Sequence, residues 1–320
     1  MSRFPLELTA PAIDAHAHGN TGVDFVHTFE SGRPGPHVMV NAVTHGNEIC
    51  GAITVVRLLA MGLRPVRGTI TLSFANVDAY LRFDPAQPYA TRFIDEDFNR
   101  VWRPETLDGP RDSVELRRAR RLRPFVESAD YLLDIHSMLE PSPPVMICGP
   151  LDKGIDFGFD VGVPKFIVSD EGHANGTRMR DFGGFGDCTS PKNALLVECG
   201  QHWERSAAAV AWQCTWRFLH HLGVVDPALA AREIDAAPPP PPVLVRVTEA
   251  VVARTPSFRF AREFSGMQAV PKAGDPIAYD GDTVVRAPYD ECVLVMPVPN
   301  NVKTGLTAVR LGRIERRQAP

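Results

Sequence analysis

Apolar runs of strand length alternate with segments of helical periodicity through the first two thirds of the chain. Strand-like runs lie at residues 37–44, 69–77, 131–135, 165–169 and 194–199. Apolar residues recur at helical spacing at residues 49–62, at 113–129 with an interruption at Pro124, and at 204–222. Continuous apolar strands that alternate with helices are typical of a sheet covered on both faces. The pattern therefore predicts an α/β fold with a largely parallel sheet flanked by helices.

A run of five prolines at residues 238–242 separates this region from a different pattern. Consecutive prolines form a semi-rigid spacer rather than part of a core. Beyond them, short strand-like runs at 243–252, 257–260, 276–279 and 293–298 are separated by glycine and proline turns. We expect an α/β domain at residues 1–237, a linker at 238–242 and a small β domain at 243–320. Within the first domain, residues 83–110 are long, polar and irregular, which favours a functional loop.

Composition and charge narrow the classes of partner. The chain is 44% hydrophobic and 22% charged with a formal net charge of −4, so neither nucleic acid nor a membrane surface is favoured. Five arginines at residues 117–123 are interpreted as a solvated helix face. No stretch reaches the roughly 18 to 20 apolar residues that span a bilayer, and the N-terminus has no apolar signal core. The cytoplasm is the expected location, and the six scattered cysteines are interpreted as small buried residues.

The sharpest local motif is His45-Gly46-Asn47-Glu48, which follows a strand and opens a helix. A spacing of three places the imidazole and the carboxylate on one side of the first helical turn, where both can bind one cation. Gly46 lets the backbone turn sharply between them. The motif alone is weak, because a helix-capping glutamate beside an unrelated histidine gives the same letters.

Two further strand ends carry polar residues of the same kind. His136 follows the apolar strand at residues 131–135, and ligands of open α/β sheets collect beyond the carboxyl ends of strands. His45, Glu48 and His136 therefore form a candidate zinc set with an open fourth position, as catalytic zinc requires. Asp134 is a candidate for orienting one of the imidazoles.

Glu198 ends the apolar run at residues 194–197. A carboxylate that closes a buried strand is costly unless it is paired or functional. Beside a metal, its natural task is to take the proton of the attacking water and to deliver it to the leaving nitrogen. A structural ion pair is the alternative interpretation.

With these residues in view, the chain resembles the succinylglutamate desuccinylase and aspartoacylase family, relatives of the zinc carboxypeptidases. The motifs that carry the resemblance are residues 45–48 (HGNE), 92–100 (RFIDEDFNR), 133–136 (LDIH) and 197–200 (VECG). Each is common singly, but the four in this order are specific. The resemblance covers residues 37–205 well and the C-terminal region only in outline. It implies a mixed sheet flanked by helices and a β domain that narrows the cleft.

The resemblance also implies roles for individual residues. One Zn²⁺ per chain would be held by His45, Glu48 and His136, with Glu198 as general base. Asn99 and Arg100 would contact the substrate carboxylate, with Arg92 near the same anion, because an arginine fork and an amide bind a carboxylate in defined geometry. Arg100 would also polarise the acyl carbonyl together with zinc.

Two parts of the family pattern have no clear counterpart. The family's tyrosine from the β domain could correspond to Tyr279 or to Tyr289, and the sequence favours neither of the two. A further anion-binding arginine is matched only by Arg178 and Arg180, which lie farther from Glu198 than the pattern suggests. The sequence therefore does not identify the acyl group of the substrate. It does not fix the oligomeric state either, and a homo-oligomer is compatible with it.

The predicted function is zinc-dependent hydrolysis of the amide bond of a small-molecule N-acyl amino acid. A zinc carboxypeptidase acting on short peptides shares the same metal set and is the first alternative. A non-catalytic binding module with a relic metal site is the second, although retention of all three ligands and Glu198 argues against it. The run Asp14-Ala15-His16-Ala17-His18 imitates the metal motif of amidohydrolase barrels, but no apolar strand precedes it.

Overall fold

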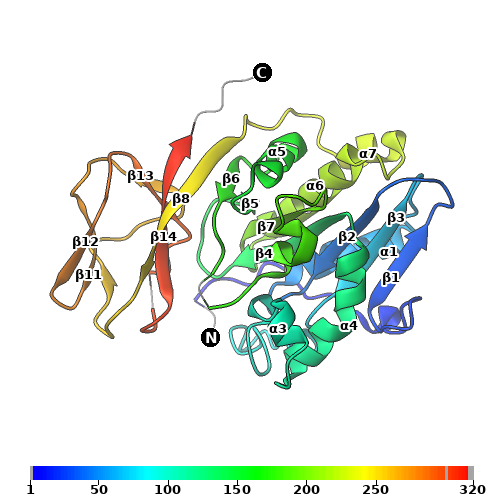
Figure 1. The fold of residues 1–320 in the computed structure, drawn as a ribbon, viewed down its shortest axis with the longest axis horizontal. Helices are drawn as coiled ribbons and strands as arrows, with labels where there is room; N and C mark the ends of the chain where they lie inside the picture. Colours follow the sequence, from blue (N-terminus) through cyan, green and yellow to red (C-terminus); the bar gives the residue numbers. More distant parts are fainter. Residues whose placement is uncertain (1–2, 174, 300–301, 316–320) are drawn as a thin grey trace.

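The protein is built around one mixed sheet of eleven strands in the order β1-β3-β2-β4-β7-β5-β6-β8-β14-β13-β10 (Figure 1). The computed structural model describes residues 3–173, 175–299 and 302–315. The strands of the first part are β1 (Val26–Glu30), β2 (His37–Ala42), β3 (Thr69–Phe74), β4 (Tyr131–Met138), β5 (Val145–Ile147), β6 (Phe166–Ser169) and β7 (Asn193–Gln201). Strands β3, β2, β4 and β7 run parallel, whereas β1 and β5 pair antiparallel with β3 and β7.

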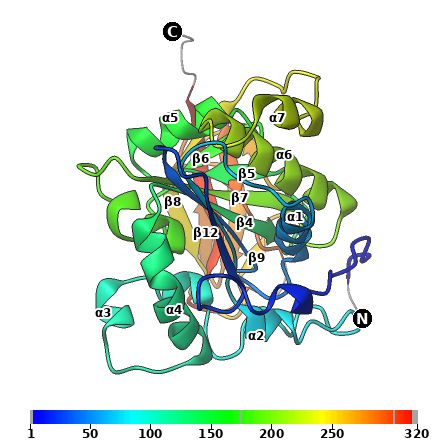
Figure 2. The ribbon, with the colours of Figure 1, turned by 90° about the vertical axis from the view of Figure 1, so that its right-hand side faces the viewer.

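Helices cover both faces of this sheet (Figure 2). One core packs α1 (Ile49–Ala60), α5 (Asp152–Val161), α6 (Arg205–His221) and α7 (Pro227–Glu233) against the sheet, and the other packs α3 (Pro104–Leu107) and α4 (Val114–Ser128). Alternate residues of a strand face opposite sides. Accordingly, Leu133 and Ile135 of β4 belong to the first core and Leu132 to the second. The predicted α/β fold with a mixed sheet is confirmed.

Two details of the α4 segment differ from the prediction. The helix runs on through Pro124, because this residue is exposed and the backbone carbonyl that loses its partner can be hydrated. Arg118 is not on a solvated face: it is buried and donates to the backbone oxygens of Phe74 and Ala75 at the end of β3. The other arginines of the group are at least partly exposed.

The C-terminal region continues the large sheet. Strand β8 (Val243–Val252) pairs parallel with β6, and β14 (Thr307–Glu315), β13 (Cys292–Val295) and β10 (Gln268–Val270) follow antiparallel. A separate three-stranded sheet holds β9 (Arg259–Phe260), β11 (Pro276–Asp280) and β12 (Thr283–Arg286). Strands β6 and β8, which lie on either side of the five prolines in the sequence, thus pair within one sheet. The division into domains at 238–242 stays a prediction.

Residues 83–110 form a long loop with little regular structure. They contain the 3-10 turn η2 (Phe98–Arg100) and α3, and the short α2 (Val77–Tyr80) precedes them. The buried carboxylate of Glu115 on α4 accepts hydrogen bonds from the backbone of Ile94 and Asp95, which fixes the loop. Among the described residues, no helix has the length and apolar character needed to cross a membrane.

Candidate active site and metal centre

The site lies where three neighbouring parallel strands end. In the register of the sheet, Ala42 of β2 pairs with Ile135 of β4, and His136 pairs with Glu198 of β7. His45 follows β2 by three residues, so side chains far apart in the sequence meet at one edge. The amidohydrolase-like run has no comparable place, because Asp14–His16 is a 3-10 turn and the sheet is not a barrel.

The chain leaves β2 through strained backbone. Val43 is buried with φ 63°, a conformation that β-branched residues rarely adopt and that costs about 1–3 kcal/mol. Gly46 is required for close approach rather than for its backbone angles, because a Cβ there would lie 2.4 Å from the backbone oxygen of Thr91. Gly46 N also donates to the backbone oxygen of Arg92 at 3.0 Å. This contact ties the metal motif to the loop at residues 83–110.

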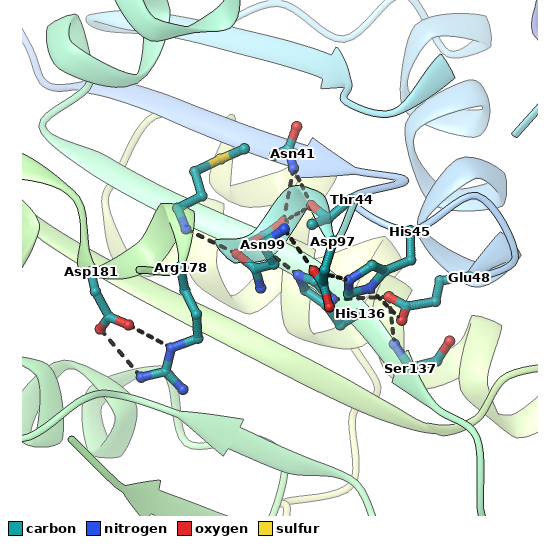
Figure 3. A network of polar contacts seen from close by, with 12 residues as sticks. Asn41, Thr44, His45, Glu48, Asp97, Asn99, His136, Ser137, Arg178 and Asp181 are labelled. Carbon is teal, nitrogen blue, oxygen red and sulfur yellow. Dashed lines mark hydrogen bonds and ion pairs between the residues drawn. The ribbon is translucent and has the colours of Figure 1, made fainter. Parts of the chain in front are cut away.

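His45, Glu48 and His136 form a compact, buried group (Figure 3). Glu48 Oε1 lies 2.7 Å from His45 Nδ1, and Glu48 Oε2 lies 2.9 Å from His136 Nδ1. One ligand atom from each residue lies within 4.8 Å of the others. Glu48 occupies the N-cap of α1 without capping it through its side chain, which rules out the capping alternative. Two imidazole nitrogens and one carboxylate oxygen fit a single zinc ion.

Carboxylates orient both imidazoles from behind. Asp134 Oδ2 lies 2.8 Å from His136 Nε2, and Asn41 and Thr44 donate to its other oxygen. Asp97 Oδ1 lies 3.0 Å from His45 Nε2. With Nε2 of His136 donating to Asp134, Nδ1 of this ring is the nitrogen left for a metal. His45 likewise turns its Nδ1 toward Glu48.

The electrostatics of the group favour a cation. Burial alone would raise the pKa of Glu48, but His45 and His136 hold it well below its usual value. Burial would likewise lower the pKa of His136, but the charges of Asp134 and Glu48 raise it well above the usual value. The site therefore holds positive charge between its carboxylates, and a divalent cation can replace the protons.

Glu198 stands beside this group with an unpaired oxygen. Its Oε2 is buried and has no hydrogen-bond partner among the described residues. Burial raises the pKa of Glu198 to about 8, although the charge of His136 acts in the opposite direction. A carboxyl group whose pKa lies near neutrality is suited to take up and release a proton.

A cavity of about 790 Å³ opens next to the three ligands and Glu198. It is lined on one side by Arg92, Asn99 and Arg100 from the loop at residues 83–110. The other side is supplied by residues after β13 and on β14. The predicted metal, base and carboxylate-binding residues thus share one cavity.

The two loop arginines take different places. Arg92 contacts the ligand group itself, with Nη1 3.3 Å from Glu48 Oε1 and Nη2 3.0 Å from His45 Nε2. Arg100 lies farther out, where Nη2 is 3.9 Å from Asp97 Oδ2 and Nη1 donates to Asn99 O. Asn99 Oδ1 accepts from Met179 N, which orients its amide.

Arg178 and Arg180 are both buried, but only Arg178 lines the cavity. Arg178 is paired with Asp170 and Asp181. Arg180 donates to backbone oxygens of Cys148 and Ala194 behind the cavity wall. Tyr279 and Tyr289 are not among the described lining residues, and the hydroxyl of Tyr289 bonds to Thr248.

Several lining residues were not foreseen from the sequence. Asp97 lies within the RFIDEDFNR run, where nothing in the sequence distinguishes it from the acidic residues Asp95 and Glu96. His202, four residues after Glu198, bonds through Nδ1 to Ser137 Oγ at 2.8 Å, and burial lowers its pKa to about 3, so it is neutral. Arg310 of β14 enters from the C-terminal region, where no motif marked it.

Residues 34–144 match the model of the succinylglutamate desuccinylase/aspartoacylase catalytic domain. The predicted resemblance to this family is confirmed. The match contains His45, Glu48, Arg92, Asn99, Arg100 and His136. A comparison with curated protein sequences returns no significant match.

Solved structures of desuccinylase/aspartoacylase proteins share the fold over most of both chains. Succinylglutamate desuccinylase from Vibrio cholerae superposes with a TM-score of 0.66 at 17% identity, covering 91% of this chain and 86% of that one. A succinylglutamate desuccinylase/aspartoacylase from Rhodobacter sphaeroides gives 0.64 at 16%, covering 93% and 90%. An aspartoacylase family protein from Mesorhizobium loti gives 0.63 at 19%, covering 91% and 89%.

Proposed function

We propose that the protein is a zinc-dependent deacylase that hydrolyses the amide bond of an N-acyl amino acid. The observation that carries the proposal is the buried carboxyl of Glu198, which stands with one unpaired oxygen beside the His45, Glu48 and His136 group at the wall of a cavity. The family whose catalytic model matches residues 34–144 is named after succinylglutamate desuccinylase and aspartoacylase, which hydrolyse N-acyl amino acids.

One Zn²⁺ held by His45, Glu48 and His136 would supply a Lewis acid for water and the amide carbonyl. Glu198 accepts the proton of the attacking water and returns it to the departing amine. Arg92, which contacts the ligand group, donates to the carbonyl oxygen as negative charge develops there. The sequence-based prediction assigned this polarising role to Arg100.

Asn99 and Arg100 hold the carboxylate of the amino acid half. The side chain of Asn99 is fixed through Met179 N, and Arg100 is 22% exposed, so its guanidinium reaches the cavity. A fixed amide and a planar guanidinium together orient a carboxylate and so place the scissile bond.

Two alternatives share parts of this site. A carboxypeptidase needs room for a peptide chain, whereas here residues from the C-terminal region, Met296 and Arg310 among them, line the cavity opposite the loop. A relic binding module would not be expected to keep a glutamate with a buried oxygen that has no partner among the described residues, as Glu198 Oε2 is, because an unused buried carboxyl oxygen lowers stability. Both features favour the deacylase.

The test is a screen of the zinc-loaded protein against N-acetyl, N-formyl and N-succinyl amino acids and a panel of short peptides. Release of free amine from N-acyl amino acids, abolished by a chelator and restored by Zn²⁺, is the expected result. Hydrolysis of peptides alone would favour the carboxypeptidase, and zinc binding without hydrolysis of any compound would favour the relic.

A further inference from the structure

His202 is a cavity residue that the proposed reaction does not use. It follows β7, lines the cavity and is 1% exposed, and its backbone N donates to Met138 O at the end of β4. Its Nδ1 lies 2.8 Å from Ser137 Oγ, whereas no described residue forms a hydrogen bond with Nε2. A polar atom in so enclosed a place calls for a partner from the cavity.

The contact with Ser137 decides which ring nitrogen carries the proton. Burial lowers the pKa of His202 to about 3, so the neutral ring has a single N–H. The hydroxyl of Ser137 is in a residue that is 3% exposed, and His202 Nδ1 is its one hydrogen-bond partner among the described residues. The hydroxyl therefore donates to Nδ1, because the opposite direction would leave a buried O–H without an acceptor. Nε2 then carries the ring proton and is a donor.

Ser137 also places this donor beside the metal group. Its backbone N donates to Glu48 Oε2 at 3.4 Å, so Ser137 connects a metal ligand to His202. Figure 3 shows Ser137 beyond Glu48, on the side away from Arg178. Asn99, which holds the amino acid carboxylate in the proposed reaction, accepts from the backbone of the residue after Arg178. The acyl half of a substrate that spans the metal therefore extends toward Ser137 and His202.

Asn47 supplies a second unused polar group at this end. It is 2% exposed and lines the cavity, and its buried Oδ1 has no hydrogen-bond partner among the described residues. Trp203 holds the two residues near each other. Its Nε1 donates to Asn47 O at 3.3 Å, and its ring packs on that of His202 with 5.6 Å between the centroids. The acyl end of the cavity thus offers an unused acceptor and an unused donor.

A hydroxyl group matches this pair, because it donates one hydrogen bond and accepts others. A methyl group in its place would leave both Asn47 Oδ1 and His202 Nε2 unpaired, which is unfavourable for buried polar atoms. A carboxylate only accepts, so it would leave Asn47 Oδ1 unpaired.

We propose that His202 and Asn47 form a hydrogen-bonding subsite for the acyl group, and that the preferred acyl group is an α-hydroxyacyl group, with its hydroxyl next to the carbonyl carbon. This proposal rests on the proposed deacylase function. Ser137 is a positioning residue in it, because it holds the ring of His202 with the proton on Nε2.

The first experiment measures binding separately from turnover. Zinc-loaded Glu198→Gln is titrated by calorimetry with N-glycoloyl-, N-propanoyl- and N-oxalyl-L-alanine, whose acyl groups are close in size and carry a hydroxyl, a methyl and a carboxylate. We expect the glycoloyl compound to bind about tenfold or more tighter than the other two, because they leave buried polar groups unpaired. Equal affinity for the glycoloyl and propanoyl compounds, tighter binding of the oxalyl compound, or no binding of any compound overturns the proposal.

Two variants in the same Glu198→Gln background test the residues themselves. His202→Phe keeps a ring and removes the donor, so the ratio of glycoloyl to propanoyl affinity should fall to about one. Ser137→Ala is the milder change: it lets the ring proton move to Nδ1, so the ratio should fall here as well, even if His202→Phe does not fold. His220→Phe, at an exposed position on α6, is the matched control and should keep the ratio.

The ratio distinguishes the proposed role from a structural one. A general loss of packing weakens both compounds alike, whereas loss of the donor weakens the glycoloyl compound more. A ratio in Ser137→Ala and in folded His202→Phe equal to that of the control would contradict the subsite.

Turnover of the same compounds by the zinc-loaded wild type separates this proposal from the deacylase function. If none is hydrolysed but the glycoloyl preference in binding holds, the function is wrong and the subsite stands. If the compounds are hydrolysed but the glycoloyl and propanoyl groups bind equally, the function stands and the subsite is wrong.

Discussion

Asp134 and His136, two residues apart on β4, form a buried pair with 2.8 Å between Oδ2 and Nε2. Side chains two apart on a strand face the same side, and here they meet because Asn41 and Thr44 fix the carboxylate from β2 and the loop after it. The pair leaves His136 Nδ1 pointing at Glu48. A carboxylate that holds the outer nitrogen of a ligand strengthens the imidazole as a donor.

Asp134→Asn should weaken zinc binding by about 10- to 100-fold, since the imidazole loses its charged partner. Zinc affinity measured by competition with a chromogenic chelator checks this. The exposed Asp282→Asn serves as the control and should bind zinc like the wild type. Equal affinity in Asp134→Asn and the control would mean that Asp134 does not tune the metal.

His136→Ala should lose both bound zinc and amide hydrolysis, because two ligands rarely hold catalytic zinc. Metal content by atomic absorption, after dialysis against a weak chelator, is the measurement. The exposed His220 on α6 provides the matched variant, His220→Ala. Full zinc content in His136→Ala refutes the assignment of this ligand.

Arg100→Ala should raise KM and lower kcat together, because the carboxylate clamp both binds the substrate and places its amide. KM and kcat of Arg100→Ala are measured by steady-state kinetics on the best substrate of the screen. Arg232→Ala, at an exposed position on α7, is the reference variant. Kinetics indistinguishable from that reference would remove Arg100 from substrate binding.

The metal-free protein should lose stability as the pH rises from about 5 to 8. The pKa of Glu198 is about 8 in the folded state and near its usual 4.5 when unfolded, so the folded state holds a proton that the unfolded state releases. This contribution to the free energy of unfolding is fully present below 4.5 and is lost through pH 8. Urea unfolding of chelator-treated wild type and Glu198→Gln tests it. Parallel pH curves for the two proteins would contradict a raised pKa.

The ends of the strands could be predicted from the sequence, because a strand that is buried on both faces consists of a continuous run of apolar residues. His45, His136 and Glu198 each stand where such a run stops, and parallel neighbours bring those ends together. The convergence of His45, Glu48 and His136 therefore follows from local pattern and the rule for parallel sheets. The resemblance implied a mixed sheet, whereas no pattern in the sequence predicted that β5 pairs antiparallel with β7.

Residues fixed by long-range packing were not readable. Asp97 meets His45 only because Glu115 and Gly46 hold the loop at residues 83–110 against the strand ends. Arg310 reaches Asp170 across the sheet from β14, a strand with no motif. Arg118 was misjudged because its charge suggested exposure, while backbone oxygens at the end of β3 satisfy it in the interior.

The central claim is that Glu198 moves the proton in a metal-assisted hydrolysis. Zinc-loaded Glu198→Gln should keep its metal and its fold while turnover falls by about two to four powers of ten, the usual scale for loss of a general base. Glu105→Gln, at an exposed position on α3, should retain wild-type turnover. Parallel measurement of zinc content and kcat in these two variants is the decisive test. Near-normal turnover in Glu198→Gln with zinc bound would contradict the mechanism.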